Sequence, residues 1–390
     1  MRAYFDHAAT SPMPLVVRKA FFDALGTVGN PASQHADGQA ARDVLESARE
    51  ILARTLHVTS AEVVFTSGGT ESINLALKGL FWARNSGADS RPVILVADGE
   101  HHATIDTVEW LVAHTGAEAE WLPLNSDGVL LPEVLEAAIT KHGAERIALA
   151  TVLWANNEIG TIQPVSSLNQ ICERHGIPLH IDAVSALGYI DISAVHPAAL
   201  SLSAHKIGGP VSSGALILGR KWQVVPLIHG GSQQRARSGT QDAAAATAFA
   251  TALELAYQDL DRKHARLQQI QQRLITAIRE TDGTAVLRGP EPGEMRLASN
   301  VHFTFPGCQG DSLLFLLDMA GVSVSTGSAC TAGVAEVSHV MTAIGLDDVS
   351  AAGALRFTFS ADTTDAEIEM LLTALPQAIL QARRAGITAV

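Results

Sequence analysis

The chain contains Phe65-Thr66-Ser67-Gly68-Gly69-Thr70-Glu71-Ser72, the segment from which we infer its fold. An apolar strand pattern ends here, two glycines permit a tight turn, and a helical pattern begins near Thr70. A strand that turns directly into a helix is the repeating unit of an open α/β sheet. The free backbone N–H groups of the helix start and the Thr70 hydroxyl can bind an anion. Simple helix capping explains the same residues, so an anion site here needs further support.

The same alternation continues along the chain. Most of the predicted strands are continuous apolar runs, which is typical of strands buried on both faces of a largely parallel sheet; they cover residues 63–66, 93–97, 119–123, 147–153, 178–182, 199–203 and 214–218. The helices predicted between them cover residues 39–56, 70–84, 103–115, 132–142 and 165–175. Near Thr240 the pattern changes to a long helical stretch (243–281), β-rich stretches (295–305 and 354–359) and further helices (311–319 and 365–384), which predicts a second, smaller α+β unit.

Composition excludes several classes of protein. The 390 residues include 27 Lys+Arg and 40 Asp+Glu, a net charge of −13, with 47% hydrophobic and 17% charged residues. Disordered chains lack so much apolar content, and nucleic acids and anionic membranes favour basic rather than acidic partners. Three cysteines without a C-x-x-C pair form no disulfide framework, no apolar run nears the roughly 20 residues that span a bilayer, and Met1–Asp6 lacks a secretion signal. We expect a globular protein of the reducing cytoplasm.

A second motif, Ser203-Ala204-His205-Lys206-Ile207-Gly208-Gly209-Pro210, follows another apolar strand. Burial lowers the pKa of a lysine, and a neutral amine condenses with a carbonyl to form a Schiff base. Ser203 and His205 are candidate phosphate donors. A solvated surface lysine remains the alternative interpretation.

A third motif, Leu179-His180-Ile181-Asp182, places His180 and Asp182 on one face of a strand. H-x-D can bind a metal ion, which supports a rival metallohydrolase hypothesis, but no H-E-x-x-H or third ligand accompanies it. Asp182 can instead pair with a protonated ring nitrogen or form a structural salt bridge.

The three cysteines differ in their surroundings. Cys172 lies at helical spacing from Leu168 and is predicted to be core, whereas Cys308 follows Phe305-Pro306-Gly307 in a predicted loop. Cys330 is surrounded by small residues in a segment that leaves its thiol uncovered. The pattern alone leaves both a nucleophilic and a structural Cys330 open.

Together these segments resemble the cysteine desulfurases, pyridoxal 5'-phosphate (PLP) enzymes of the class V aminotransferase family with the aspartate-aminotransferase (type I) fold. The resemblance runs from Tyr4 to Phe357, and its Gly327-Ser328-Ala329-Cys330-Thr331 segment is similar to group I, the housekeeping and nitrogen-fixation type. Its other motifs are Tyr4 to Thr10, Gly29 to His35, Phe65 to Asn74, Glu100-His101, Asn156 to Gly160, Asp182, His205-Lys206 and Arg237 to Thr240. The resemblance implies a large PLP-binding domain over residues 16–250 and a small domain over residues 251–390, with residues 1–15 contributing to the small domain.

The resemblance also implies roles for individual residues. Lys206 binds PLP covalently, Asp182 keeps the pyridine nitrogen protonated, and His101 stacks on the ring and can shuttle protons. The remaining implied cofactor-binding residues are Gly69, Thr70, Asn157, Ser185, Ser203, Ala204 and His205, together with Thr240 from the partner subunit of a homodimer.

L-cysteine is the implied substrate, with its carboxylate bound by Arg356 and with contacts from Asn30 and Asn157. Cys330, as thiolate, is expected to attack the substrate sulfur, retain it as a persulfide and release alanine. An iron–sulfur scaffold or a tRNA-thiolation enzyme is the expected sulfur acceptor, and Cys330 is a candidate transient cluster ligand. No direct nucleic-acid or membrane partner is expected.

Some positions depart from the family pattern. Ser185 replaces the glutamine that hydrogen-bonds the cofactor's phenolic oxygen, and serine is too short to do so without a water. The other departures are His7 for asparagine, Gln234 for glutamate, Val337 for proline and Ser360 for glycine. The alternatives left open are a related PLP enzyme (selenocysteine lyase, sulfoxide lyase, epimerase or aminotransferase) and an inactive sulfur-transfer scaffold.

Overall fold

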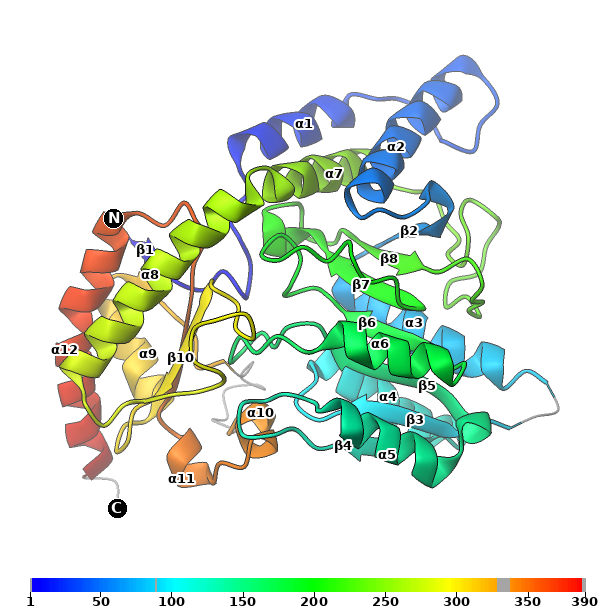
Figure 1. Ribbon diagram of the computed structural model, residues 1–390. Helices are drawn as coiled ribbons and strands as arrows, with labels where there is room; N and C mark the ends of the chain where they lie inside the picture. Colours follow the sequence, from blue (N-terminus) through cyan, green and yellow to red (C-terminus); the bar gives the residue numbers. More distant parts are fainter. Residues whose placement is uncertain (1, 88–89, 328–336, 388–390) are drawn as a thin grey trace.

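The computed structural model describes residues 2–87, 90–327 and 337–387 (Figure 1). Its largest sheet has seven strands in the order β2-β8-β7-β6-β5-β3-β4, and only β8 runs antiparallel to its neighbours. The strands are β2 (Val63–Thr66), β3 (Val93–Ala97), β4 (Glu118–Leu122), β5 (Ile147–Leu153), β6 (Leu179–Asp182), β7 (Ala199–Ser203) and β8 (Gly214–Leu218). The predicted mixed, mostly parallel sheet is therefore confirmed.

Helices cover both faces of this sheet because successive strand side chains point to opposite faces. On β2, Val63 and Phe65 belong to the core shared with α2, α5, α6 and α7, whereas Val64 belongs to the core shared with α3 and α4. These helices are α2 (Ala36–Thr55), α3 (Gly69–Arg84), α4 (His102–Thr115), α5 (Pro132–His142), α6 (Val165–Arg174) and α7 (Ala243–Tyr257). The sequence did not predict α1 (Leu15–Leu25), which lies along α7.

A second group of elements surrounds a separate hydrophobic core that includes Phe303, Phe305 and Phe357. It contains an antiparallel sheet, β12-β10-β9, and a parallel pair, β1-β11, which joins the start of the chain to a segment over 300 residues later. Its elements are β1 (Ala3–Tyr4), α8 (Leu260–Thr281), β9 (Val286–Leu287), β10 (Asn300–Thr304), α9 (Gly310–Met319), β11 (Val322–Ser323), β12 (Ala354–Thr358) and α12 (Asp365–Ile387). The short helices α10 (His339–Ala343) and α11 (Asp348–Ala351) pack around a further small core with Ile159. The expected domain boundaries stay a prediction.

The prediction of one helical stretch over residues 243–281 is wrong in one detail, because the stretch is broken between α7 and α8. Asp259 adopts the left-handed conformation with φ of 53°, a region that aspartate tolerates better than most residues. The Lys263 amine then donates hydrogen bonds to the carbonyls of Leu255 and Ala256 at the end of α7. These contacts satisfy carbonyls that a continuous helix would have used.

The side chain of Gln234 pairs with the backbone of the outer strand β2. Its amide nitrogen donates to Phe65 O at 2.7 Å, and its amide oxygen accepts from Phe65 N at 3.0 Å. A glutamate at this position could make only the second bond. The departure from the family pattern therefore has a structural use.

Within the three described ranges, no helix is both long and apolar enough to cross a membrane.

Candidate active site

A cavity of about 270 Å³ opens where β6 and β7 end and α3 begins. The carboxyl ends of parallel strands meet at this edge of the sheet, which is where ligands bind in open α/β folds. The cavity is lined by Gly69, Thr70, Ile73, His101, Leu153, Asn157, Asp182, Val184, Ser185, Ser203, His205 and Lys206. The structure thus brings together nine of the residues predicted from the sequence.

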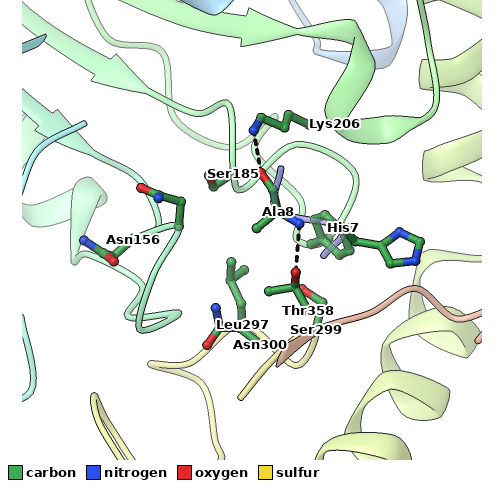
Figure 2. A pocket seen from close by; sticks show the side chains of 11 residues that line it. His7, Ala8, Asn156, Ser185, Lys206, Leu297, Ser299, Asn300 and Thr358 are labelled. Carbon is green, nitrogen blue, oxygen red and sulfur yellow. Dashed lines mark hydrogen bonds between the residues drawn. The ribbon is translucent and has the colours of Figure 1, made fainter. Parts of the chain in front are cut away.

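Lys206 reaches this cavity from a short 3-10 turn, η3 (Ala204–Ile207), that directly follows β7. Its amine donates a hydrogen bond to the carbonyl of Ala8 (Figure 2) and another to the carbonyl of Ala9 at 3.0 Å. Burial and the nearby charge of Arg356 lower the pKa of Lys206 to about 8, against the opposing effect of Asp182 and a second carboxylate. The amine is therefore neutral far more often near pH 7 than an ordinary lysine.

Asp182 is the last residue of β6, and its side chain is buried. One carboxylate oxygen accepts a hydrogen bond from Val184 N at 2.9 Å. Burial raises the pKa of Asp182 to about 6, while the Val184 N–H and the Lys206 charge oppose the rise. Asp182 thus places a mostly ionised carboxylate inside the cavity at pH 7.

The wall of the cavity also contains groups that can bind an anion. Helix α3 begins at Gly69, so its first backbone N–H groups and the Thr70 hydroxyl are at the cavity wall. A Cβ atom at Gly69 would lie 2.8 Å from Val184 Cγ2, so only glycine permits this close approach. Ser203 and His205 line the same cavity and add possible phosphate donors.

His101 is the N-cap residue of α4, with its Nδ1 accepting a hydrogen bond from Ala103 N at 3.0 Å. His101 and His102 therefore lie at the start of a helix. Burial of the ring, which removes water from it, and the positive charge of Lys206 lower the pKa of His101 to about 4. The ring is neutral at pH 7 and flanks the cavity as an aromatic surface.

A second, smaller cavity lies beside the first and shares Asn157, Ser185 and Lys206 with it (Figure 2). Its volume of about 20 Å³ is enough for one water molecule. The remaining lining residues are His7, Ala8, Asn156, Tyr189, Leu297, Ser299, Asn300 and Thr358. The short side chain of Ser185 thus lies in the wall that the two cavities share, beside space for one water molecule.

Arg356 lies behind the cavity wall rather than in it. The side chain is buried on β12, its Nη2 lies 2.8 Å from Asp6 Oδ1, and its Nη1 donates to Asn157 O at 3.0 Å. Its Nε is buried and finds no hydrogen-bond partner in the described part of the chain. One donor of Arg356, the buried Nε, is therefore left without a partner in the described part of the chain.

Besides Arg356, three predicted site residues in the described part of the chain are not in the wall of the main cavity. Asn30 and Thr240 are exposed, and Ala204 is buried in η3 just before His205. Cys330 lies outside the described residues, so its roles as nucleophile and as cluster ligand stay predictions.

The histidine of the alternative metal motif is fully engaged in other contacts. His180 is buried, with Nδ1 bonded to Thr151 Oγ1 and Nε2 to Ser201 Oγ, each at 2.8 Å. Neither ring nitrogen is left for a metal ion, and no cluster of three potential ligands occurs among the described residues. His180 is a core histidine.

The donor set of the main cavity fits a phosphorylated aromatic aldehyde. A helix N-terminus can bind a phosphate, a carboxylate at the end of β6 can pair with a protonated ring nitrogen, and an amine with a lowered pKa can condense with an aldehyde. These are the groups that PLP presents.

The sequence profile described as Aminotransferase class-V matches residues 3–371. The chain belongs to this family. It is 45% identical to the "IscS-like cysteine desulfurase" of Mycobacterium tuberculosis (99% of this chain and 98% of that protein) and 36% identical to "Cysteine desulfurase IscS" of Dictyoglomus turgidum (97% and 95%). A solved structure called "NIFS-LIKE PROTEIN" superposes with a TM-score of 0.88 at 31% identity, covering 98% of this chain and all of that one.

Class V aminotransferases are PLP-dependent enzymes, in agreement with the donor set. Sequence reasoning did not anticipate the contacts that Asp6, Ala8 and Ala9 make with Arg356 and Lys206. The first ten residues gave a signal only as a matching motif, because a pairing across about 200 to 350 positions leaves no local pattern.

Proposed function

We propose that the protein is a PLP-dependent cysteine desulfurase that converts L-cysteine to L-alanine and retains the sulfur as a persulfide on Cys330. The observation that carries this proposal is the convergence of Lys206, Asp182 and the start of α3 on one cavity. The full-length similarity to proteins named cysteine desulfurases supports the choice of substrate.

Lys206 would bind PLP covalently, Asp182 would hold the proton on the ring nitrogen, and His101 would lie against the ring. The phosphate would be held by Gly69, Thr70, Ser203 and His205, next to the buried Ala204, with Asn157 and Ser185 on the opposite side. Bound PLP supplies an electron-accepting ring that weakens the bonds around the substrate's α- and β-carbons.

The substrate carboxylate would bind the Arg356 guanidinium, whose Nη1 donates to Asn157 O in the cavity wall and whose Nε has no partner in the described part of the chain. Asn30 stays a further candidate contact. Lys206 would remove the α-proton, a task that its lowered pKa favours, and later return a proton to the substrate.

Cys330 would act as a thiolate on the substrate sulfur. A sulfur–sulfur bond forms as the Cβ–S bond breaks, the electron pair left on carbon takes up a proton, and alanine leaves. One enzyme thiol and one cysteine thus give one enzyme persulfide and one alanine. An iron–sulfur scaffold or a tRNA-thiolation enzyme of the cytoplasm would then accept the sulfur, and Cys330 would at most transiently ligate a cluster.

A homodimer would complete the site, with Thr240 of one subunit reaching the phosphate of the other. Two observations support it: Thr240 is exposed and outside the cavity of its own chain, and α1 with its following turn leaves Leu15, Phe22, Leu25 and Val28 between 60% and 81% exposed. Apolar side chains this exposed are typical of an interface.

The test is to incubate the purified protein with L-cysteine and to quantify alanine and enzyme-bound sulfur. The wild type should be yellow, lose its visible band on borohydride reduction, and form both products. Cys330→Ala should retain the colour but form no persulfide, whereas the matched control Cys308→Ala, which removes a buried thiol, should form both products. A colourless protein that does not respond to added PLP would overturn the proposal.

A further inference from the structure

Gly327, just before segment 328–336, and Ser338, shortly after it, both lie beside one buried carboxylate, that of Glu158, which is 3% exposed. On one side, Ser338 Oγ donates to Glu158 Oε2 at 2.5 Å. On the other, a Cβ atom built on Gly327 would lie 3.0 Å from the same oxygen. Two points 11 positions apart in the sequence therefore meet at one atom.

The position of Glu158 is itself fixed by its backbone. Its N–H donates to Asn156 Oδ1 at 2.8 Å, and its carbonyl accepts from Asn300 Nδ2 at 2.9 Å and from His302 Nδ1 at 3.1 Å. Asn300 and His302 belong to β10, and Asn156 also donates to Gly99 O at 3.1 Å. The carboxylate is thus held between the small sheet and the loops at the cavity.

His339, which follows Ser338, contacts the loop before α4. His339 Nε2 lies 2.7 Å from Glu100 O, and the rings of His339 and His102 meet edge to face at 4.7 Å. Asn157, next to Glu158, and His101, next to Glu100, both line the main cavity. The flank is therefore docked onto the two loops that shape the cavity wall.

Gly327 is required for the close approach on the other flank. Its φ is +96°, and a Cβ atom would also lie 3.4 Å from His302 Cε1. A side chain would both strain the backbone and push against Glu158. The absence of a side chain here keeps this flank in contact with the carboxylate.

Burial raises the pKa of Glu158, although the Ser338 hydroxyl and the charges of His339 and Arg356 oppose the rise. Burying a carboxyl group costs free energy that an apolar residue would not. The contacts with Ser338 and Gly327 offset part of this cost.

Cys330 lies three positions after Gly327 and eight before Ser338. We propose that Glu158 is a positioning residue that holds both flanks of the Cys330 segment at the cavity and so sets the rate at which Cys330 receives sulfur. This inference rests on the proposed desulfurase activity.

The experiment compares two rates in the holoenzyme: the change in cofactor absorbance when L-cysteine binds, and the transfer of labelled sulfur to Cys330 in a single turnover, measured by mass spectrometry of the Cys330 peptide. Glu158→Ala should leave the absorbance change close to wild type and slow the transfer, on the order of 10²-fold if the thiol is misplaced by about 1 Å. Glu158→Gln keeps an acceptor for Ser338 and should restore most of the rate.

Ser338→Ala should slow the transfer less than Glu158→Ala, and the double variant should be no slower than Glu158→Ala, because both substitutions remove one interaction. Asp282→Ala is the matched control, because this buried carboxylate also accepts a hydrogen bond from a hydroxyl group, Thr284 Oγ1, at 2.7 Å. Its loss should lower the stability of the protein without slowing the transfer.

If Glu158→Ala fails to fold, Ser338→Ala and Glu158→Gln carry the test. Equal slowing of both rates, or an unchanged transfer rate in both Glu158→Ala and Ser338→Ala, would overturn the inference. A wild type that transfers no sulfur would instead refute the proposed function.

Discussion

Asp6 Oδ1 and Arg356 Nη2 form an ion pair 2.8 Å long between the segment after β1 and strand β12. The arginine side chain is 5% exposed and the aspartate 23% exposed. Because Nη1 is bound to Asn157 O, the guanidinium plane is fixed by two contacts. Asp6 thereby orients the arginine that we assign to the substrate carboxylate.

Asp6→Ala should leave the Arg356 charge buried without its counter-ion. We expect the free energy of unfolding of the apoprotein to fall by about 3 kcal/mol, and the KM for L-cysteine to rise because the guanidinium is no longer oriented. Urea denaturation and steady-state alanine formation measure the two effects. Asp6→Asn keeps the hydrogen-bond acceptor but not the charge, so its free energy of unfolding should lie between those of the wild type and Asp6→Ala. Equal stability of all three proteins would show that the ion pair is dispensable.

Lys206 should make the stability of the apoprotein depend on pH. Its pKa is lowered from 10.5 to about 8 in the folded state, so between these values the unfolded chain binds more protons and stability rises with pH. Below pH 8 the full cost is present, and Lys206→Met should stabilise the apoprotein at pH 7 by up to about 3 kcal/mol.

This advantage of Lys206→Met should shrink as the pH rises from 8 to 10.5, as measured by chemical denaturation at each pH. Lys206→Arg stays charged throughout and should show no such gain. An advantage that is the same at pH 7 and pH 10.5 would contradict the lowered pKa.

Asp182→Asn should retain the hydrogen bond from Val184 N but lose the charge. We expect PLP to remain bound while alanine formation falls on the order of 10³-fold, because the neutral amide no longer keeps the ring nitrogen of PLP protonated. Asp191→Asn is a matched control, because Asp191 Oδ1 accepts from Ser193 N at 2.8 Å in the same kind of turn. Similar losses in both variants would point to the turn rather than the charge.

Ser185 lines both cavities, so Ser185→Gln should extend a longer side chain from their shared wall towards the cofactor. One new hydrogen bond to the cofactor is worth about 1 kcal/mol, or roughly a fivefold slower release of PLP. PLP release is followed by absorbance after dilution, with Ser185→Ala as the control that adds no group. Faster release from Ser185→Gln would mean that the cavity does not accept the longer side chain.

Thr240→Ala and Lys206→Ala should complement each other if Thr240 acts across a dimer. Each variant alone should be impaired, but a mixed dimer would contain one complete site. Random reassociation of equal amounts should therefore recover about one quarter of the wild-type sites. Recovery no greater than the sum of the separate variants would place Thr240 outside the partner's site.

The large sheet could be predicted because most of its strands are apolar runs that alternate with helical patterns. Since the carboxyl ends of parallel strands share an edge, Asp182 and Lys206 could be placed together without knowing any contact. The motif order added the identity of the expected cofactor.

Other features depend on contacts that leave no local pattern. The Asp6–Arg356 pair spans 350 positions, and the break between α7 and α8 depends on Asp259 and the reach of Lys263. Helix α1 was missed because its apolar side chains point outward as well as inward: Val17 is buried, whereas Phe22 is 77% exposed.

The hydrogen bonds between Gln234 and Phe65 also bear on behaviour at high concentration. An outer strand with open N–H and C=O groups invites pairing with a strand from another polypeptide, the first step towards fibrils. In β2 the side-chain amide occupies both groups of Phe65, so an incoming strand finds no free pair there. The glutamine makes this border of the sheet a poor template for aggregation.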